Sequence, residues 1–281
     1  MTKLRIVGPR PLQGEVSVGG AKNAALKMLV ACLLTDEECI IHNVPRIKDV
    51  EVMLEVLRYV GCEADFCAKH AVRVRACGEL GYHAPDELVR RMRASIQVMG
   101  PLLARLGKVE VAYPGGCAIG ERPIDIHLAG FTALGAKIKE QEGFIFAEAK
   151  ELVGCEFYLD FPSVGATENL IMAAVLAKGR TVLHNVAREP EIVDLQEFLN
   201  RMGAKVRGAG TDRIIIEGVE KLHGAEHWVI PDRVEAGTFL LAGAITRGEV
   251  FVRHAKSEHL EALVAKMQQS GVKVVPDATG V

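Results

Sequence analysis

The sequence predicts a mixed α/β (α+β) fold in which one unit of helices and strands is repeated along the chain. A glycine that follows a helix-like stretch recurs four times, and these glycines are 74, 68 and 68 residues apart: Gly61, Gly135, Gly203 and Gly271. The stretches before them have apolar residues three and four positions apart, as in a helix buried on one face. A repeat of this length exceeds that of the common helical solenoids and favours helices packed beneath sheets.

Each unit is expected to contain two helices, with strands between and after them. The first helices are placed at residues 21–34, 91–106, 167–177 and 235–246. A short strand follows each of them, at residues 38–42, 109–112, 181–184 and 249–253. The second helices are clearest at residues 50–59, 194–202 and 260–269, and residues 213–217 have the pattern of a further strand. Each repeated glycine is predicted to cap a second helix, because glycine accepts the left-handed conformation that ends many helices.

The units predict two domains, in agreement with a length of 281 residues. Three units, within residues 22–230, are expected to close one complete domain that carries a cysteine-bearing loop. The fourth unit, in residues 231–281, is expected to join residues 1–21 in a second domain that the sequence leaves incomplete. A first strand is placed at residues 3–7, where it can pair with that second domain.

Composition indicates an ordinary globular protein and excludes several classes. The net charge is −2 and no long block of one sign occurs, so neither a nucleic-acid partner nor a membrane partner is expected. The N-terminus lacks a signal-peptide core, and the longest apolar run, 24–34, is too short to cross a bilayer. The seven cysteines form no CxxC pair and have no metal-type spacing, which supports neither a disulfide framework nor a zinc site and fits a reducing cytoplasm. No metal and no cofactor is expected. Six of them are expected to be small core residues: Cys32, Cys39, Cys62, Cys67, Cys77 and Cys155.

Cys117 differs from these because it lies in the glycine-rich segment 114–123, shortly before Arg122. Reactive groups are often carried on such loops, and Arg122 can bind a carboxylate or phosphate through two hydrogen bonds. A nearby cation would lower the pKa of the thiol and a closed apolar lid would raise it, so its protonation state stays open. An ordinary turn with an incidental cysteine is the alternative, and a nucleophile pair with His127 is a less favoured one.

Three helix starts have the features of anion sites. Lys22 and Asn23 follow Gly19 and Gly20 at the start of a predicted helix, where free N–H groups favour phosphate or carboxylate. The spacing is not that of a P-loop, and a solvated first-turn lysine is the alternative. Arg93 and the segment 163–167 occupy the equivalent places in the second and third units.

The fourth helix begins with Asp232, Arg233 and Glu235. Asp232 is a natural N-cap, and Glu235, three residues later, fits a capping box. Arg233 has no such explanation, and we expect it to close the two domains over a ligand.

Taken together, these motifs resemble the UDP-N-acetylglucosamine 1-carboxyvinyltransferases, enolpyruvyl transferases that open peptidoglycan precursor synthesis. The resemblance extends over essentially the whole chain and rests on residues 19–24, 93–96, 115–123, 163–167, 187–194 and 231–233. The related shikimate-pathway transferase shares the fold but is not expected to carry the cysteine loop or the run 187–194.

The resemblance implies an inside-out α/β barrel pair of two domains with three units each, and substrates between them. Two units are then missing here, together with an aspartate and arginines of the family's site, so this chain alone is expected to be inactive. The implied reaction transfers the enolpyruvyl group of phosphoenolpyruvate to the 3-hydroxyl of UDP-N-acetylglucosamine and releases phosphate. The alternatives are a related transferase with another acceptor and a catalytically dead UDP-sugar-binding fragment.

The resemblance also implies roles for individual residues. Cys117 would be the loop acid that protonates the methylene carbon and forms a covalent adduct with phosphoenolpyruvate. Phosphoenolpyruvate would be bound by Lys22, Asn23 and Arg122, and the catalytic set would be Cys117, Lys22 and Arg122. The UDP-sugar would be bound by Arg93, Arg122, Pro123, Ile124, Asp125, Ile126, Ser163, Val164 and Gly165, with Arg233 as a further substrate contact. Phe161 and Pro162 precede Ser163 where some members have a lysine, so a direct charge contact is not expected there.

Overall fold

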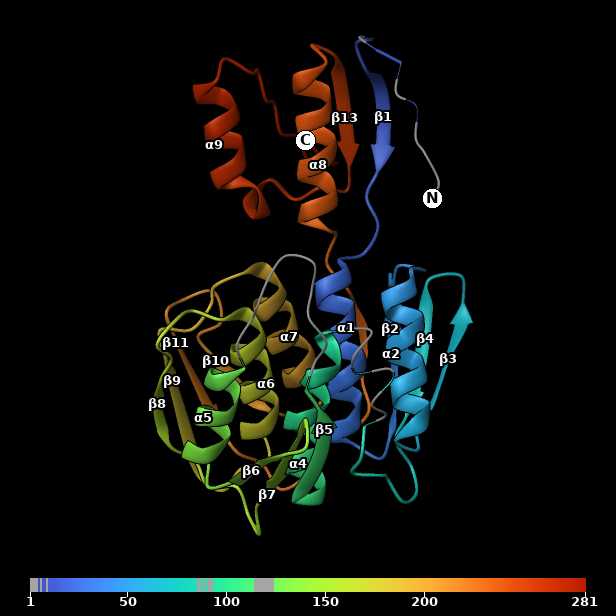
Figure 1. Cartoon of the computed structure of the whole chain (residues 1–281). Helices are drawn as coiled ribbons and strands as arrows, with labels where there is room; N and C mark the ends of the chain where they lie inside the picture. Colours follow the sequence, from blue (N-terminus) through green and yellow to red (C-terminus); the bar gives the residue numbers. More distant parts are fainter. Residues whose placement is uncertain are drawn as a thin grey trace. The chain divides into compact units, whose positions relative to one another are not determined.

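The computed structural model describes residues 5, 7, 8, 10–84, 87, 89, 93–113 and 124–281, and it describes Arg93 without its side chain. The chain divides into two compact units (Figure 1). The larger unit is Lys22–Ile230, and the smaller unit combines Met1–Ala21 with Pro231–Val281. Most of the strand expected at residues 3–7 lies outside the described residues, as does the loop 114–123.

In the larger unit, three sheets of the described residues share one topology. Their strands are β2 (Glu38–His42), β3 (Glu63–Ala68) and β4 (Ala71–Arg75); β5 (Lys108–Ala112), β6 (Lys137–Gln141) and β7 (Phe144–Glu148); and β9 (Arg180–His184), β10 (Lys205–Arg207) and β11 (Arg213–Glu217). In each sheet the last of the three strands lies between the other two and pairs antiparallel with both. The expected repeat is therefore present in the hydrogen-bonding pattern as well as in the sequence.

A further segment pairs in parallel with the first strand of each sheet. The segment is β12 (Glu226–Trp228) for β2 and β8 (Glu156–Tyr158) for β9. In the second sheet a single parallel bridge from His83 to Glu110 takes the same place. Because β12 comes from the end of the larger unit, it completes the sheet that the unit's first strand begins.

The helices of the larger unit are packed among its sheets (Figure 1). They are α1 (Lys22–Ala31), α2 (Lys48–Tyr59), α4 (Met99–Leu106), α5 (Asp125–Ala133), α6 (Val164–Ala174) and α7 (Pro190–Arg201), with 3₁₀ helices η1 (Cys32–Leu34) and η2 (Arg93–Val98). Helices α1 and α6 are buried almost all round, in agreement with sequences that are apolar except for Lys22, Asn23 and Lys27 in α1 and residues 167–169 in α6. Helices α2 and α7 bury one face, in agreement with their amphipathic sequences.

The four repeated glycines end helices as predicted. Their φ angles are +103° at Gly61, +98° at Gly135, +99° at Gly203 and +84° at Gly271. In each case the next residue's N–H reaches back to a carbonyl of the helix, for example Cys62 N to Leu57 O at 2.9 Å and Ala204 N to Leu199 O at 3.0 Å. This is the Schellman pattern, in which a left-handed residue satisfies the last carbonyls of a helix.

The smaller unit contains a fourth copy of the parallel pair. Strand β1 (Gln13–Ser17) pairs in parallel with β13 (Glu249–Arg253). Helix α8 (Arg233–Ile245), the 3₁₀ helix η3 (Ser257–His259) and α9 (Glu261–Gln269) complete the described elements. Its core combines residues from both ends of the chain, among them Val18, Leu240, Val252, Met267 and Val281.

Several element boundaries differ from those expected. Helix α6 begins at Val164, three residues earlier than expected, because Ser163 caps its N-terminus. Helix α7 begins at Pro190, which is favoured at a first helical position. The helix expected at 91–106 is divided into η2 and α4 in its described part.

Candidate functional site

Lys22 is the first residue of α1, and its ammonium is paired with a carboxylate. Nζ of Lys22 lies 3.0 Å from Oδ2 of Asp49, which belongs to the first turn of α2. Both side chains are about half exposed, at 44% and 42%. An exposed pair of this kind contributes little stability, so its main effect is to orient the ammonium. Asp49 was not predicted; the signal was an acidic residue at the start of the second helix.

Asn23, the neighbouring candidate, has an exposed side chain. Its backbone carbonyl accepts a hydrogen bond from Nζ of Lys27 at 3.2 Å. Lys22 and Asn23 therefore share an accessible helix start, as the sequence predicts.

The segment Ser163, Val164 and Gly165 forms the start of α6. The hydroxyl of Ser163 accepts from the N–H of Ala166 at 3.3 Å, which satisfies a free donor of the first turn. The carbonyl of Gly165 accepts from Nε2 of Gln97 in η2 at 2.9 Å. The contact therefore joins η2 to the start of α6.

Asn169, one turn further along α6, fixes two more elements. Its Oδ1 accepts from the N–H of Gly100 in α4 at 2.8 Å. Its Nδ2 donates to Ile96 O at 3.1 Å and lies 3.1 Å from Nδ1 of His127 in α5. Because the Gly100 contact fixes the amide orientation, Nδ1 of His127 must be the acceptor, and the imidazole carries its proton on Nε2. His127 is 4% exposed, so it belongs to this buried network.

The remaining candidates of the larger unit lie around the start of α5. Ile124 is the buried N-cap residue, Asp125 is exposed in the first turn and Ile126 is partly buried. Cys117, Arg122 and Pro123 lie outside the described residues, and so does the side chain of Arg93. The pairing of Cys117 with His127 or with Arg122 is therefore untested.

A buried ion pair that was not predicted joins α1 to α6. Nζ of Lys27 lies 2.8 Å from Oε2 of Glu168, and the two side chains are 9% and 0% exposed. Burial raises the pKa of Glu168 above its ordinary value of 4.5, although the Lys27 ammonium opposes the shift. The signal in the sequence was a run of polar residues inside an otherwise apolar helix.

The cysteines expected in the core differ in exposure. Cys32, Cys39 and Cys62 are buried, and burial raises the pKa of Cys62 to about 12. Cys77 and Cys155 are partly buried. Cys67 is exposed on β3, so the expectation that it is a core residue is wrong: every second side chain of this strand faces solvent.

In the smaller unit, Asp232 caps α8 as predicted. Its Oδ1 accepts from the N–H groups of Val234 and Glu235 at 2.8 and 3.0 Å. The capping box is wrong, because Oε2 of Glu235 accepts from the N–H of Gly19 at 3.0 Å instead. The N–H of Asp232 donates to the carbonyl of Gly19. Arg233 is the first residue of α8 and is partly buried.

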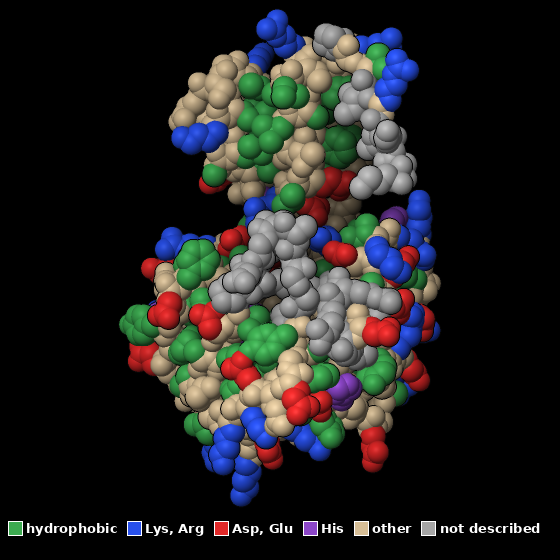
Figure 2. All heavy atoms as spheres, in the orientation of Figure 1, with side chains coloured by type: hydrophobic (Ala, Val, Ile, Leu, Met, Phe, Trp, Pro, Cys, Tyr) green, Lys and Arg blue, Asp and Glu red, His purple; other side chains and the backbone are tan. Residues whose placement is uncertain are grey.

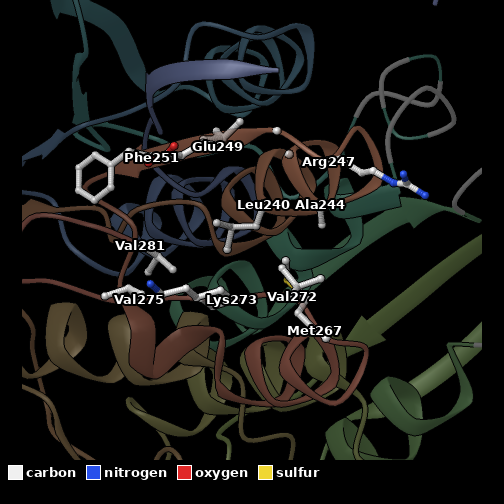
Figure 3. A pocket seen from close by; sticks show the side chains of 15 residues that line it. Leu240, Ala244, Arg247, Glu249, Phe251, Met267, Val272, Lys273, Val275 and Val281 are labelled. Atoms are coloured by element: carbon white, nitrogen blue, oxygen red, sulfur yellow. The ribbon is translucent and has the colours of Figure 1, made fainter. Parts of the chain in front are cut away.

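The smaller unit also has a pocket of about 740 Å³ between α8, β13 and the end of the chain (Figure 3). Aliphatic side chains such as Leu240, Val272 and Met267 line it, and Arg247 extends away from them. Hydrophobic side chains are also exposed on this unit (Figure 2), among them Val234, Leu241 and Ile245. The pocket contains none of the described site candidates.

The described residues contain neither a candidate metal site nor a candidate membrane span. No group of three or more His, Cys, Asp or Glu side chains in this part of the chain is placed to hold a metal ion. Within the same residues, every helix is too short or too polar to span a membrane.

Comparison with known sequences gives a consistent result. The sequence model of EPSP synthase (3-phosphoshikimate 1-carboxyvinyltransferase) matches residues 6–280. A relative from Symbiobacterium thermophilum, named UDP-N-acetylglucosamine 1-carboxyvinyltransferase 1, is 56% identical over 281 residues, covering 98% of this chain and 64% of the relative. A relative of the same name from Staphylococcus epidermidis is 55% identical over 275 residues, covering 97% and 65%. The chain thus spans slightly less than two thirds of these relatives.

Solved structures confirm the fold class. The enolpyruvyl transferase NikO from Streptomyces tendae superposes with a TM-score of 0.86 at 22% identity, covering 97% of this chain and 66% of that protein. EPSP synthase from Acinetobacter baumannii gives a TM-score of 0.73 at 19% identity, covering 94% and 61%. At these identities the likeness concerns the fold alone, and the expected inside-out α/β barrel type is correct.

Proposed function

The chain belongs to the EPSP synthase family, and from this membership we propose that its protein transfers the enolpyruvyl group of phosphoenolpyruvate to the 3-hydroxyl of UDP-N-acetylglucosamine. We choose UDP-N-acetylglucosamine as the acceptor because it is named in the relatives' names. These relatives are identical to the chain at more than half of the aligned positions. Because the chain spans about 64% of the relative from Symbiobacterium, the proposal concerns a protein of the relatives' length. The reaction belongs to peptidoglycan precursor synthesis, for which we propose the cytoplasm as compartment.

We assign phosphoenolpyruvate to Lys22, Asn23 and Arg122. Two features of the described residues support this: the Lys22 ammonium is half exposed, and it lies at a helix start where free N–H groups favour an anion. Asp49 orients the ammonium without burying it.

The UDP-sugar is assigned to two neighbouring helix starts and the loop between. Ser163, Val164 and Gly165 form the first, and Arg93 begins η2, which Gln97 ties to Gly165. Residues 122–126 lead into α5, which Asn169 ties to the same place through His127. Arg233, in the smaller unit, is assigned to substrate as a further contact.

Cys117 is the proposed proton donor. A proton delivered to the methylene carbon of phosphoenolpyruvate gives oxocarbenium character at the adjacent carbon, which the sugar hydroxyl attacks; loss of phosphate and of a proton then restores the double bond. A thiol on a closing loop suits this step, because closure excludes water from the cation. If the Cys117 thiolate, instead of the sugar hydroxyl, attacked the cationic carbon next to the methylene carbon, the product would be the covalent adduct.

Labelling of Cys117 tests the assignment. An epoxide-type thiol reagent is expected to modify Cys117 faster when UDP-N-acetylglucosamine is present, and mass spectrometry locates the label. The exposed Cys67 is a competing thiol, so the experiment uses a Cys67→Ser background. Equal labelling of the remaining cysteines, with or without the sugar nucleotide, would contradict the proposal.

The acceptor and the activity need separate measurements. UDP-N-acetylglucosamine is expected to raise the melting temperature, and shikimate 3-phosphate is not; the reverse result would indicate a transferase with another acceptor. Phosphate release is then measured with the chain alone and with a protein of the relatives' length. Binding without phosphate release in the longer protein would indicate a catalytically dead binding protein.

A further inference from the structure

Three consecutive polar residues of α6 are fully buried. Thr167, Glu168 and Asn169 each have 0% exposure, within a helix whose other buried residues are apolar. Successive residues of a helix point about 100° apart, so three neighbours in sequence reach three different directions. Buried polar groups are costly unless each has a partner, so the contacts of this polar triplet indicate what it holds.

Each member contacts a different segment of the larger unit. The hydroxyl of Thr167 accepts from the N–H of Ala187 at 3.2 Å, just before α7. Asn169 binds η2, α4 and α5 through the contacts given above. Glu168 contacts Lys27 of α1. The triplet thus joins α6 to α1, η2 and α5, the other helices of the larger unit that begin at or next to a site candidate.

The Lys27–Glu168 pair is the charged member of this arrangement. Besides the 2.8 Å contact with Glu168, Nζ of Lys27 donates to the carbonyl of Asn23 at 3.2 Å. One ammonium therefore connects the first turn of α1 with α6. Burial raises the pKa of Glu168 against the opposing effect of the Lys27 ammonium, so this carboxylate is held at a desolvation cost.

We infer that the Lys27–Glu168 pair positions the start of α1 against the start of α6. It thereby sets the spacing between Lys22 and Asn23 on one helix and Ser163 to Gly165 on the other. The functional part of this inference rests on the proposed function, in which these two starts bind the two substrates. Lys27 and Glu168 are positioning residues, because both are buried and act through the helices that they join.

The test replaces both charges by side chains of similar length, Lys27→Met with Glu168→Met. Replacing a buried ion pair by apolar side chains often leaves stability unchanged. The matched control is Lys178→Met with Glu151→Met, which removes an exposed Lys–Glu pair whose atoms are 3.9 Å apart. Three quantities are measured: the melting temperature, the affinity for UDP-N-acetylglucosamine by calorimetry, and amide hydrogen exchange at residues 25–28 and 167–170, which are the first amides of α1 and α6 with helical acceptors.

The double variant is expected to melt within a few degrees of the parent. Its amides at the start of α1 are expected to exchange at least about tenfold faster. Its affinity for UDP-N-acetylglucosamine is expected to fall by about tenfold or more, because small displacements of a binding group are costly. The control is expected to match the parent. Parental exchange rates and affinity in the double variant would overturn the inference.

Two further outcomes separate this inference from the proposed function. Faster exchange in the double variant, together with a protein of the relatives' length that does not bind UDP-N-acetylglucosamine, would refute the proposed function and support the positioning role. If the double variant does not fold, Glu168→Gln is compared with Glu168→Leu, because only glutamine keeps an oxygen within reach of Lys27. Equal exchange at the start of α1 in these two variants would refute the positioning role.

Discussion

Glu168 illustrates how one buried carboxylate changes the response of the protein to pH. Its pKa is raised chiefly by burial, and Lys27 opposes the shift while Glu191 and Glu189 add to it. The folded protein therefore binds this proton more tightly than the unfolded chain does. The resulting stabilisation is complete below the ordinary pKa of 4.5 and is lost as the pH rises through the raised value.

Glu168→Gln removes this titration and keeps the shape of the side chain. The free energy of unfolding of the variant, minus that of the parent, is therefore expected to increase as the pH rises from about 4 to about 8. Urea unfolding at several pH values measures it, with Glu151→Gln as an exposed control. A difference that stays constant or decreases over this range would show that the pKa of Glu168 is not raised.

At the level of secondary-structure elements, the repeated glycines that end helices provide a direct test of backbone strain. Gly135 has φ +98°, and a Cβ there would meet only Glu151 O, at 3.8 Å. Gly135→Ala is therefore expected to cost about 1–2 kcal/mol, the cost of a left-handed conformation for alanine. Gly61→Ala is expected to cost more, because its Cβ would lie 3.0 Å from Glu79 O. Chemical denaturation measures both, and equal losses would contradict the role of the backbone contact.

Two glycines inside helices test packing instead of strain. A Cβ at Gly100 would collide with the backbone O of Asn169, whereas one at Gly130 would collide with the side chain of Leu170. Gly100→Ala is expected to destabilise the protein by about 1–3 kcal/mol, despite the better helix propensity of alanine. Gly130→Ala is expected to cost less, because Leu170 can change rotamer. Thermal unfolding that ranks them in the opposite order would contradict this account.

Elements with strong local signals were predictable, and weaker ones were not. Strands β2 and β11 have the expected bounds because alternating apolar residues define them. Strand β1 was not assigned to residues 13–17, since most of its residues are exposed. The strands β8, β10 and β12 have three residues each, which is too short for a periodic pattern. Their positions depend on partners far along the chain.

The candidate site was also predictable only in part. The start of α1 followed from glycine and lysine at local positions, whereas α6 begins at Val164, three residues before its expected start. The partners that hold these two starts did not follow from local positions, because Asp49 and Gln97 are 27 and 68 residues away from the groups that they contact. Long-range contacts of this kind leave no local pattern. A polar triplet inside an apolar helix is the exception, since its composition alone indicates a buried network.

The whole larger unit is closed by its own last strand, which gives a prediction about fragments. Asp194 in α7 is 2% exposed, and its carboxylate oxygens accept from Nε2 of His227 at 2.8 Å and from the N–H of Ile230 at 3.2 Å. Both donors belong to β12 and the residues after it. A fragment that ends before β12 would leave this carboxylate buried without its partners.

A fragment of residues 22–230 is therefore expected to unfold in one cooperative step, whereas one of residues 22–225 is expected to be less stable by about 3–5 kcal/mol. Loss of the parallel pairing of β12 with β2 acts in the same direction. Urea unfolding of both fragments measures the difference. Asp194→Asn in the shorter fragment provides the control: it removes the buried charge and should recover part of the loss. Equal unfolding midpoints for the two fragments would show that β12 and its contacts with Asp194 do not close the unit.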